Sequence, residues 1–246
     1  DWIKEKKDDT VDFFIHTPSK EIECPNLYYN DALSGELKLY RDLLRNEDAF
    51  LSGSLPYGKR IVLMFEGLPG TGKTAAARWL ARNSGRDLVH VQWQTFRKQY
   101  VGESEKNMKK ILGKIDQLHQ DHEKIPVVLF NEAEALLSQR VNVTHSTDRL
   151  ENNIVAILLE WLEQQDKFGI IVFTSNHKHI MDKAYERRIM SLNFDMPDEH
   201  IRGKIWKSLG KDFGLNLTYR MIEVLKELPL TGAEIFNALK KYHLFT

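Results

Sequence analysis

The chain has 246 residues, enough for one large α/β unit or for a core followed by a small second domain. Its 35 basic and 35 acidic residues balance, which argues against a protein that coats nucleic acid. The single cysteine, Cys24, excludes an internal disulfide and favours a reducing, cytoplasmic compartment. No apolar run approaches the ~20 residues of a membrane-spanning helix, so no membrane segment is predicted.

The first part of the chain is charged and poorly periodic, and residues 1–26 are predicted to be an N-terminal arm or linker. Because the chain begins at Asp1 rather than at methionine and shows no secretory leader, we expect a fragment of a longer protein. A helix is expected at Leu33–Leu51, where apolar residues recur at helical spacing.

Short apolar runs and helical stretches alternate from there to Pro197. The runs that predict strands are Ile61–Phe65, Leu88–Trp93, Pro126–Phe130, Ile170–Thr174 and Ser191–Phe194. The stretches that predict helices are Thr74–Asn83, Ser104–His119 and Arg149–Gln164. This alternation predicts an α/β fold over residues 27–197, with a parallel five-stranded sheet and helices on both faces.

After Pro197 only helical patterns remain. They cover Glu199–Leu209, Thr218–Leu228 and Thr231–Tyr242. Asp198 and Thr231 are expected to cap two of these helices, and Glu234 completes a capping box with Thr231. Residues 198–246 are therefore predicted to form a small all-α lid domain behind the core.

A G-x-x-x-x-G-K-T motif links the first predicted strand to the helix after it. Its members are Gly67, Pro69, Gly70, Thr71, Gly72, Lys73 and Thr74. The glycines allow backbone N–H groups to surround a phosphate, and the helix N-terminus favours the same anion. Lys73 is expected to reach the β- and γ-phosphates and Thr74 to hold Mg²⁺. The motif predicts a P-loop NTPase that binds a nucleoside triphosphate.

The third predicted strand ends in Asn131, Glu132, Ala133 and Glu134. In phosphate-loop NTPases an acid at the first of these positions helps to hold Mg²⁺, and the second acid polarises the attacking water. Glu132 fits the second role, but Asn131 brings a neutral amide to the first. We predict weakened Mg²⁺ binding and slowed hydrolysis, with nucleotide binding kept. Whether Glu134 compensates stays open.

Several motifs in order make the chain resemble the AAA+ ATPases, in particular the branch that threads or remodels proteins. Gly67–Thr74 resembles the Walker A loop and Leu129–Glu134 the Walker B strand, apart from Asn131. Other matching segments are Phe173–Asn176 for sensor 1, Met181–Arg188 for the second region of homology and Leu230–Ile235 for the sensor-2 helix. The resemblance covers residues 27–242.

The resemblance implies roles for further residues. Asn176 would orient water near the γ-phosphate, although it could instead cap the following turn. Arg187 and Arg188 would reach the ATP of a neighbouring subunit, unless they are an ordinary solvated pair. Gly232 and Ala233 take the place of a sensor-2 arginine. Such arginines imply a homo-oligomeric ring, a hexamer in this family.

Two aromatic segments are similar to binding elements of the same family. Tyr100, Val101 and Gly102 resemble the pore loop that grips an extended polypeptide, which implies a protein substrate; the alternative is that Tyr100 packs in the core. Tyr28 and Tyr29 fall where related proteins line the adenine pocket, or they pack the linker onto the core.

The resulting first hypothesis is an AAA+ ATPase module that uses ATP and Mg²⁺ to remodel or thread proteins. The second is a scaffold or switch that binds ATP and assembles but hydrolyses slowly, which Asn131 favours. A third, nucleic-acid loading, is disfavoured by the neutral charge and by Gly232 and Ala233.

Overall fold

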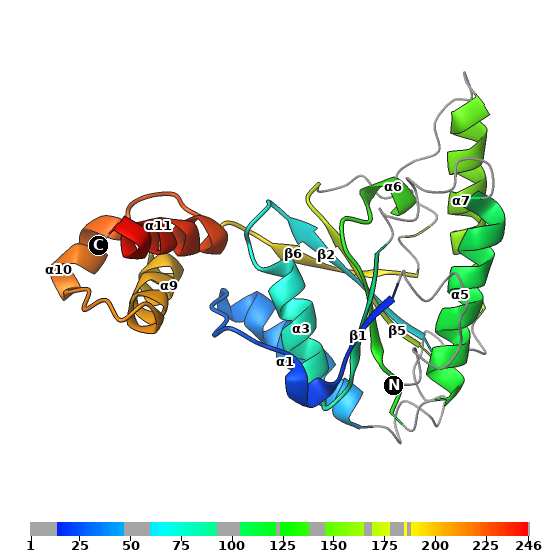
Figure 1. The fold of residues 1–246 in the computed structure, drawn as a ribbon, viewed down its shortest axis with the longest axis horizontal. Helices are drawn as coiled ribbons and strands as arrows, with labels where there is room; N and C mark the ends of the chain where they lie inside the picture. Colours follow the sequence, from blue (N-terminus) through cyan, green and yellow to red (C-terminus); the bar gives the residue numbers. More distant parts are fainter. Residues whose placement is uncertain are drawn as a thin grey trace.

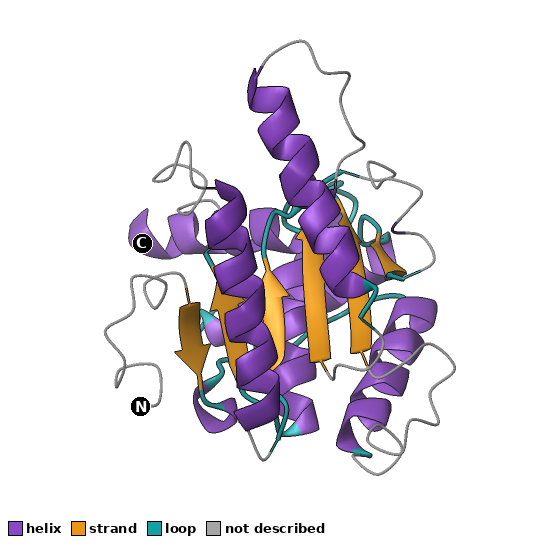
Figure 2. Cartoon of the chain, turned by 90° about the vertical axis from the view of Figure 1, so that its right-hand side faces the viewer, coloured by secondary structure: helices purple, strands orange, loops and turns teal. Residues whose placement is uncertain are grey.

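The computed structural model describes residues 14–46, 60–92, 104–121, 124–137, 146–164, 169–177, 185 and 188–245. Within these residues a six-stranded sheet has the strand order β1-β3-β4-β5-β2-β6 (Figure 2). The strands are β1 (Phe14–Thr17), β2 (Arg60–Gly67), β3 (Leu88–Val91), β4 (Val127–Phe130), β5 (Gly169–Ser175) and β6 (Met190–Phe194). All neighbouring pairs are parallel except β1 and β3.

Helices cover both faces of the sheet (Figure 1). The bounds are η2 (Ser19–Glu21), α1 (Asp31–Arg45), α3 (Lys73–Ser84), α5 (Ser104–Asp121), α6 (Glu134–Leu137) and α7 (Ser146–Leu162). The C-terminal helices are α9 (Glu199–Asp212), α10 (Tyr219–Leu225) and α11 (Gly232–Phe245). In the described part of the chain, no helix has the length and apolar character needed to cross a membrane.

Alternation along each strand divides the core in two, because successive side chains point to opposite faces. On β2, Val62 and Met64 join the cluster under α5 and α7. Ile61, Leu63 and Phe65 join the cluster under α1 and α3. The strands are buried on both faces, which explains why they read as continuous apolar runs in the sequence.

The α/β fold with five parallel strands is confirmed, but the sheet has one strand more than predicted. β1 lies in the segment predicted to be an arm and pairs antiparallel with β3 at the sheet edge. The Nε2 of His16 lies 3.0 Å from Oδ2 of Asp87, and the backbone N of Ser19 donates to Oδ1 of Asp87 at 2.8 Å. A four-residue edge strand beside charged sequence carries too little periodicity to be recognised from sequence.

The C-terminal helices have a small core of their own, formed around Trp206, Ile235 and Leu239. Both expected caps are present. Asp198 accepts from the backbone N of Ile201 at 2.8 Å, and Glu234 accepts from the backbone N and the hydroxyl of Thr231, each at 2.8 Å. These hydrogen bonds lower the pKa of Glu234. The division of the chain near residue 197 into core and lid stays a prediction.

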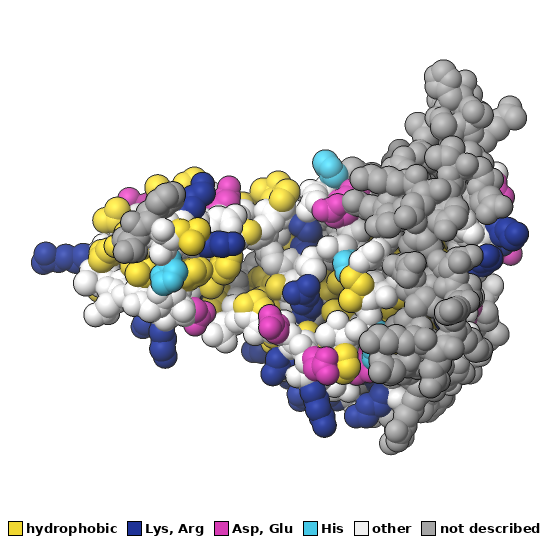
Figure 3. Space-filling view, in the orientation of Figure 1, with side chains coloured by type: hydrophobic (Ala, Val, Ile, Leu, Met, Phe, Trp, Pro, Cys, Tyr) yellow, Lys and Arg dark blue, Asp and Glu magenta, His cyan; other side chains and the backbone are white. Residues whose placement is uncertain are grey.

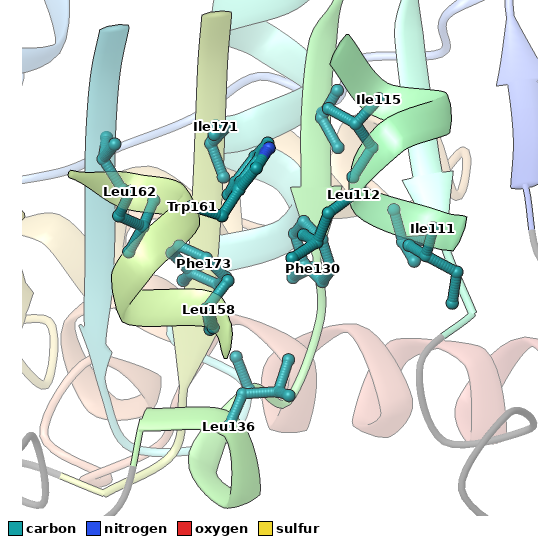
Figure 4. Packing of buried hydrophobic residues seen from close by; sticks show 14 of the residues in the cluster. Ile111, Leu112, Ile115, Phe130, Leu136, Leu158, Trp161, Leu162, Ile171 and Phe173 are labelled. Carbon is teal, nitrogen blue, oxygen red and sulfur yellow. The ribbon is translucent and has the colours of Figure 1, made fainter. Parts of the chain in front are cut away.

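Figure 4 shows the larger core cluster, in which Phe130 and Phe173 from adjacent strands meet side chains of α5 and α7. The two rings lie 5.0 Å apart between centroids. Leu158 of α7 is fully buried in this cluster. Its contacts tie α7 to the strands that end in the candidate site.

Leu158→Ala should lower the free energy of unfolding by about 2–5 kcal/mol, because it removes buried methyl groups and leaves a cavity. Urea denaturation measures the difference. Leu39→Ala is the matched control, since Leu39 of α1 is 67% exposed and should shift stability by less than about 0.5 kcal/mol. Equal losses in the two variants would contradict the burial of Leu158.

Candidate functional site

Three adjacent parallel strands bring the predicted site residues to one edge of the sheet. β5 pairs with β4 on one side and with β2 on the other. The carboxyl ends of parallel strands meet at the same edge. The loop after β2, Asn131 and Glu132 after β4, and Asn176 after β5 therefore converge in front of the N-terminus of α3.

The phosphate-loop backbone requires glycine at two positions. Gly72 has a φ of +95°, and a Cβ there would lie 2.7 Å from the hydroxyl of Tyr29. Gly70 has a φ of +81°, and a Cβ there would lie 2.6 Å from Oγ1 of Thr231. Side chains at either position would thus be strained and would clash. Bare backbone is what lets the loop approach a phosphate closely.

Lys73 opens α3, and its side chain folds back onto the loop. Its Nζ donates to the carbonyl of Gly67 at 2.7 Å and to that of Leu68 at 2.8 Å. Burial lowers the pKa of Lys73, and the negative charges of Glu134 and Glu132 oppose this effect. The ammonium group is therefore a buried cation held by carbonyl oxygens beside the loop.

Asn131 is the centre of a hydrogen-bond network between the two motifs. Its Oδ1 accepts from the hydroxyl of Thr74 at 2.9 Å and from the hydroxyl of Thr174 at 2.7 Å. The Thr174 hydroxyl in turn accepts from the backbone N of Glu132 at 3.1 Å. The residues predicted to hold the metal and to polarise water are thereby joined through one threonine.

Glu134 contacts the candidate sensor residue rather than Asn131. Its Oε1 accepts from the backbone N of Asn176 at 2.5 Å. Glu134 is also the first residue of α6. This contact ties the end of β5 to the turn that follows β4, and it places a carboxylate whose charge is felt by Lys73.

A cavity of about 800 Å³ lies between the core, the linker before α1 and the C-terminal helices, and its lining includes Lys73, Thr74, Asn131, Glu132, Thr174 and Asn176. Tyr28 and Tyr29 line it, as do Gly232 and Ala233. The Tyr29 hydroxyl donates to the carbonyl of Gly72 at 3.0 Å, and its ring packs edge-on against Phe194. Burial raises the pKa of Tyr29. Tyr29 thus packs the linker onto the core; contact of either tyrosine with a base stays a prediction.

The donor set suits a magnesium nucleotide. Thr74 and Asn131 offer oxygen donors, which Mg²⁺ prefers, and it commonly takes one or two protein ligands together with phosphate oxygens and water. Among the described residues there is no group of three or more His, Cys, Asp or Glu side chains that could hold a metal alone. A metal here would therefore depend on the nucleotide's phosphates as ligands.

Of the remaining predicted residues, the structure describes Arg188. Tyr100, Val101, Gly102 and Arg187 lie outside the described residues. Arg188 pairs through its guanidinium with Glu163, just beyond α7, and is absent from the cavity lining. The structure therefore gives Arg188 no contact with the nucleotide cavity of its own chain.

Comparison with known proteins agrees with this geometry. Residues 63–196, more than half of the chain, match the family described as "ATPase family associated with various cellular activities (AAA)". The chain belongs to the AAA family. The AAA match runs from β2 to the residue before Pro197, so it contains the phosphate loop, Asn131, Glu132 and Asn176.

The curated AAA relatives are larger proteins. Peroxisomal ATPase PEX6 of Dictyostelium discoideum is 29% identical over 78% of this chain and 16% of its own length. Fidgetin-like protein 1 of Drosophila melanogaster is 29% identical over 78% of this chain and 36% of its own length. The mitochondrial inner membrane i-AAA protease supercomplex subunit YME1 of Saccharomyces cerevisiae is 25% identical over 96% of this chain and 31% of its own. The chain thus spans about a third or less of these relatives.

A solved AAA structure has the same fold. The crystal structure of the FIGL-1 AAA domain superposes with a TM-score of 0.73 at 19% identity, covering 99% of this chain and 80% of that one. At this identity the likeness shows the fold alone.

Sequence reasoning did not assign a role to Thr174. The available signal was a hydroxyl residue after an apolar run, spaced so that its side chain lies on the same face of the strand as Ile170 and Val172. That spacing places Thr174 on the α3 face, where Thr74 and Asn131 lie. Its bond to Asn131 becomes evident only from the coordinates.

Tyr29→Phe should weaken nucleotide binding about two- to tenfold, because the carbonyl of Gly72 loses a neutral hydrogen bond that fixes the loop. Titration with a fluorescent ATP analogue measures the change. Tyr219→Phe, which alters a tyrosine that is 76% exposed, is the matched control and should bind normally. An unchanged affinity in Tyr29→Phe would show that the hydroxyl does not position the loop.

Proposed function

We propose that this chain binds ATP with Mg²⁺ and hydrolyses it. The observation that carries the proposal is the network joining Thr74, Asn131 and Glu132 through Thr174, at the mouth of the phosphate loop and within the 800 Å³ cavity. Neither the phosphate loop nor the turn after β4 would specify a reaction by itself. Together they would supply a phosphate-binding loop, oxygen ligands for a metal and a carboxylate in one cavity, which supports the proposal.

Each residue then has a definite task. Lys73 exchanges two carbonyl oxygens for phosphate oxygens, so its charge is already desolvated when the nucleotide arrives. Glu132 orients and polarises the attacking water, and Asn176 lines the same cavity. When bound, Mg²⁺ neutralises charge on the phosphate oxygens. Tyr28, Tyr29, Gly232 and Ala233 enclose the base and ribose.

A second function, an ATP-binding scaffold with little turnover, is favoured by one observation. The side chain bonded to Thr74 is a neutral amide, and hydrogen bonds to neutral groups contribute less than those to charged ones. Slow hydrolysis would leave the chain in its ATP-bound state for long periods. The two candidates share the site and differ in rate.

Turnover in two variants separates these functions. Glu132→Gln should lower the ATPase rate about 10²–10⁴-fold, because the amide cannot act as a base. Asn131→Asp should raise the rate and lower the Mg²⁺ concentration needed for half-maximal turnover, because it restores a charged ligand. Phosphate release measures both, and binding of a fluorescent ATP analogue serves as the control for an intact pocket. No effect of Glu132→Gln would exclude its role in activating water.

We further propose that the chain works as a homo-oligomeric ring, a hexamer, that acts on a protein substrate. Large apolar side chains gather on the surface of the C-terminal helices (Figure 3), among them Tyr219, Val224, Tyr242 and Leu244, each at least 56% exposed. Exposed apolar patches of this kind are typical of contact surfaces. Arg188 pairs with Glu163 and does not line the cavity of its own chain, which suits action on a neighbour's nucleotide.

The substrate is proposed to be a polypeptide gripped by Tyr100, Val101 and Gly102. Support comes from their resemblance to the pore loop and from the similarity of the chain to an i-AAA protease supercomplex subunit. The reducing compartment inferred from the single Cys24 remains part of the proposal, as does the absence of a nucleic-acid partner.

Mixing two inactive variants tests action between subunits. Arg188→Ala should lower turnover about 10³-fold or more if Arg188 completes a neighbour's site. Mixed with Glu132→Gln, it should regain part of the activity, since some interfaces then pair an intact Glu132 with an intact Arg188. The readout is the ATPase rate against mixing ratio, with Arg41→Ala, at a half-buried arginine outside the cavity lining, as the control. Absence of recovery in mixed assemblies would exclude action between subunits.

A further inference from the structure

Thr174 and Ser175 are the two polar residues that end the buried strand β5. β5 begins with Gly169, Ile170, Ile171, Val172 and Phe173, and Thr174 itself is only 2% exposed. A buried hydroxyl must find hydrogen-bond partners, because leaving it unpaired is costly. Both partners of this hydroxyl belong to the turn that carries Asn131 and Glu132.

The hydroxyl of Thr174 has one proton and accepts through its lone pairs. The backbone N–H of Glu132 donates to it at 3.1 Å. Its proton points to Oδ1 of Asn131 at 2.7 Å. The hydroxyl of Thr174 thus accepts a hydrogen bond from the backbone of Glu132 and donates one to the candidate metal ligand Asn131.

The turn that it holds is strained. Glu132 has a φ of +53°, the only positive φ of a residue other than glycine in the described part of the chain. Non-glycine residues rarely adopt this conformation, and it persists where surrounding contacts enforce it. The carbonyl of Thr174 also accepts from the backbone N of Ala133 at 2.8 Å. Thr174 therefore holds two consecutive N–H groups of this turn.

A neutral amide needs orientation that a carboxylate does not. A carboxylate presents two acceptor oxygens, whereas an asparagine side chain has an oxygen on one side and an NH₂ donor on the other. The Thr74 hydroxyl donates its proton to Oδ1 of Asn131, which leaves the Thr74 oxygen lone pairs for a metal ion. A reversed amide would donate to that oxygen and compete with the metal.

We propose that Thr174 is a positioning residue that holds the Asn131 amide with Oδ1 toward Thr74, so that a site without an acid at this position can still bind a magnesium nucleotide. This inference rests on the proposed function of the site. Thr174 contacts neither nucleotide nor metal in this role and acts through Asn131. Its second contact, with the backbone of Glu132, keeps the two residues in a fixed relation.

The test compares three substitutions at this position in two backgrounds. Thr174→Val keeps the shape and removes the hydroxyl, Thr174→Ser keeps the hydroxyl, and Thr174→Ala replaces the valine variant if that one does not fold. Each is made in the unmodified chain and with Asn131→Asp. Ser84→Ala is the matched control, since the buried Ser84 hydroxyl bonds to carbonyls of α3 at its far end.

The measured quantity is the ratio of the dissociation constants of a fluorescent ATP analogue in EDTA and in Mg²⁺. In the Asn131 background, Thr174→Val should reduce the magnesium enhancement about five- to tenfold, and Thr174→Ser should stay within about twofold of the unmodified chain. In the Asn131→Asp background the same valine substitution should change the ratio less than about twofold. Within each background the affinity in EDTA should be similar for all variants, and Ser84→Ala should match the unmodified chain.

Each other outcome is decisive. An equal loss in both backgrounds would overturn the proposal and leave Thr174 as a support for the Glu132 turn alone. No loss in Thr174→Val, or no magnesium enhancement in the unmodified chain, would overturn it while nucleotide binding stands. If the unmodified chain binds no ATP analogue in either EDTA or Mg²⁺, the proposed function fails and the Thr174 proposal fails with it.

Discussion

The candidate site depends on hydrogen bonds between polar side chains at the carboxyl ends of strands that are themselves buried. β4 and the residues of β5 are buried along their whole length, so a side chain that emerges at their ends must be satisfied by its neighbours. Asn131 meets this constraint by accepting from two hydroxyls, one from the phosphate-loop helix and one from β5. These two hydrogen bonds thereby set the distance between the phosphate-loop helix and the turn after β4.

The phosphate loop also joins the core to the C-terminal helices. The carbonyl of Gly70 accepts from the backbone N of Ala233 at 3.2 Å, and Thr231 packs where a side chain at position 70 would lie. A ligand that changes the loop must therefore change this contact or be accommodated by it. If the C-terminal helices can adopt two positions relative to the core, this contact would link their position to whether the phosphate loop holds a nucleotide.

The features that could be predicted from sequence are those whose residues lie close together along the chain. Gly72, Lys73 and the strand before them form a contiguous pattern whose chemistry is fixed by the backbone, and the Thr231–Glu234 cap depends on residues three apart. β1 could not be predicted, because its stability comes from pairing with β3 and from the contacts of Asp87 with His16 and Ser19. The role of Thr174 could not be predicted for the same reason. Its partners, Asn131 and Glu132, lie more than forty residues away in the chain, and only the strand register brings them together.

The neutral residue at position 131 changes the charge balance of the site before any ligand binds. Lys73 is a buried cation flanked by the carboxylates of Glu132 and Glu134. An aspartate at 131 would add a third negative charge at a place that must receive a polyphosphate, and charge repulsion is strongest where water is excluded. Asn131 removes that repulsion at the cost of a weaker metal ligand. In the proposed function, an asparagine here would therefore favour retention of the nucleotide and disfavour its cleavage, so that one side chain would affect binding and hydrolysis in opposite directions.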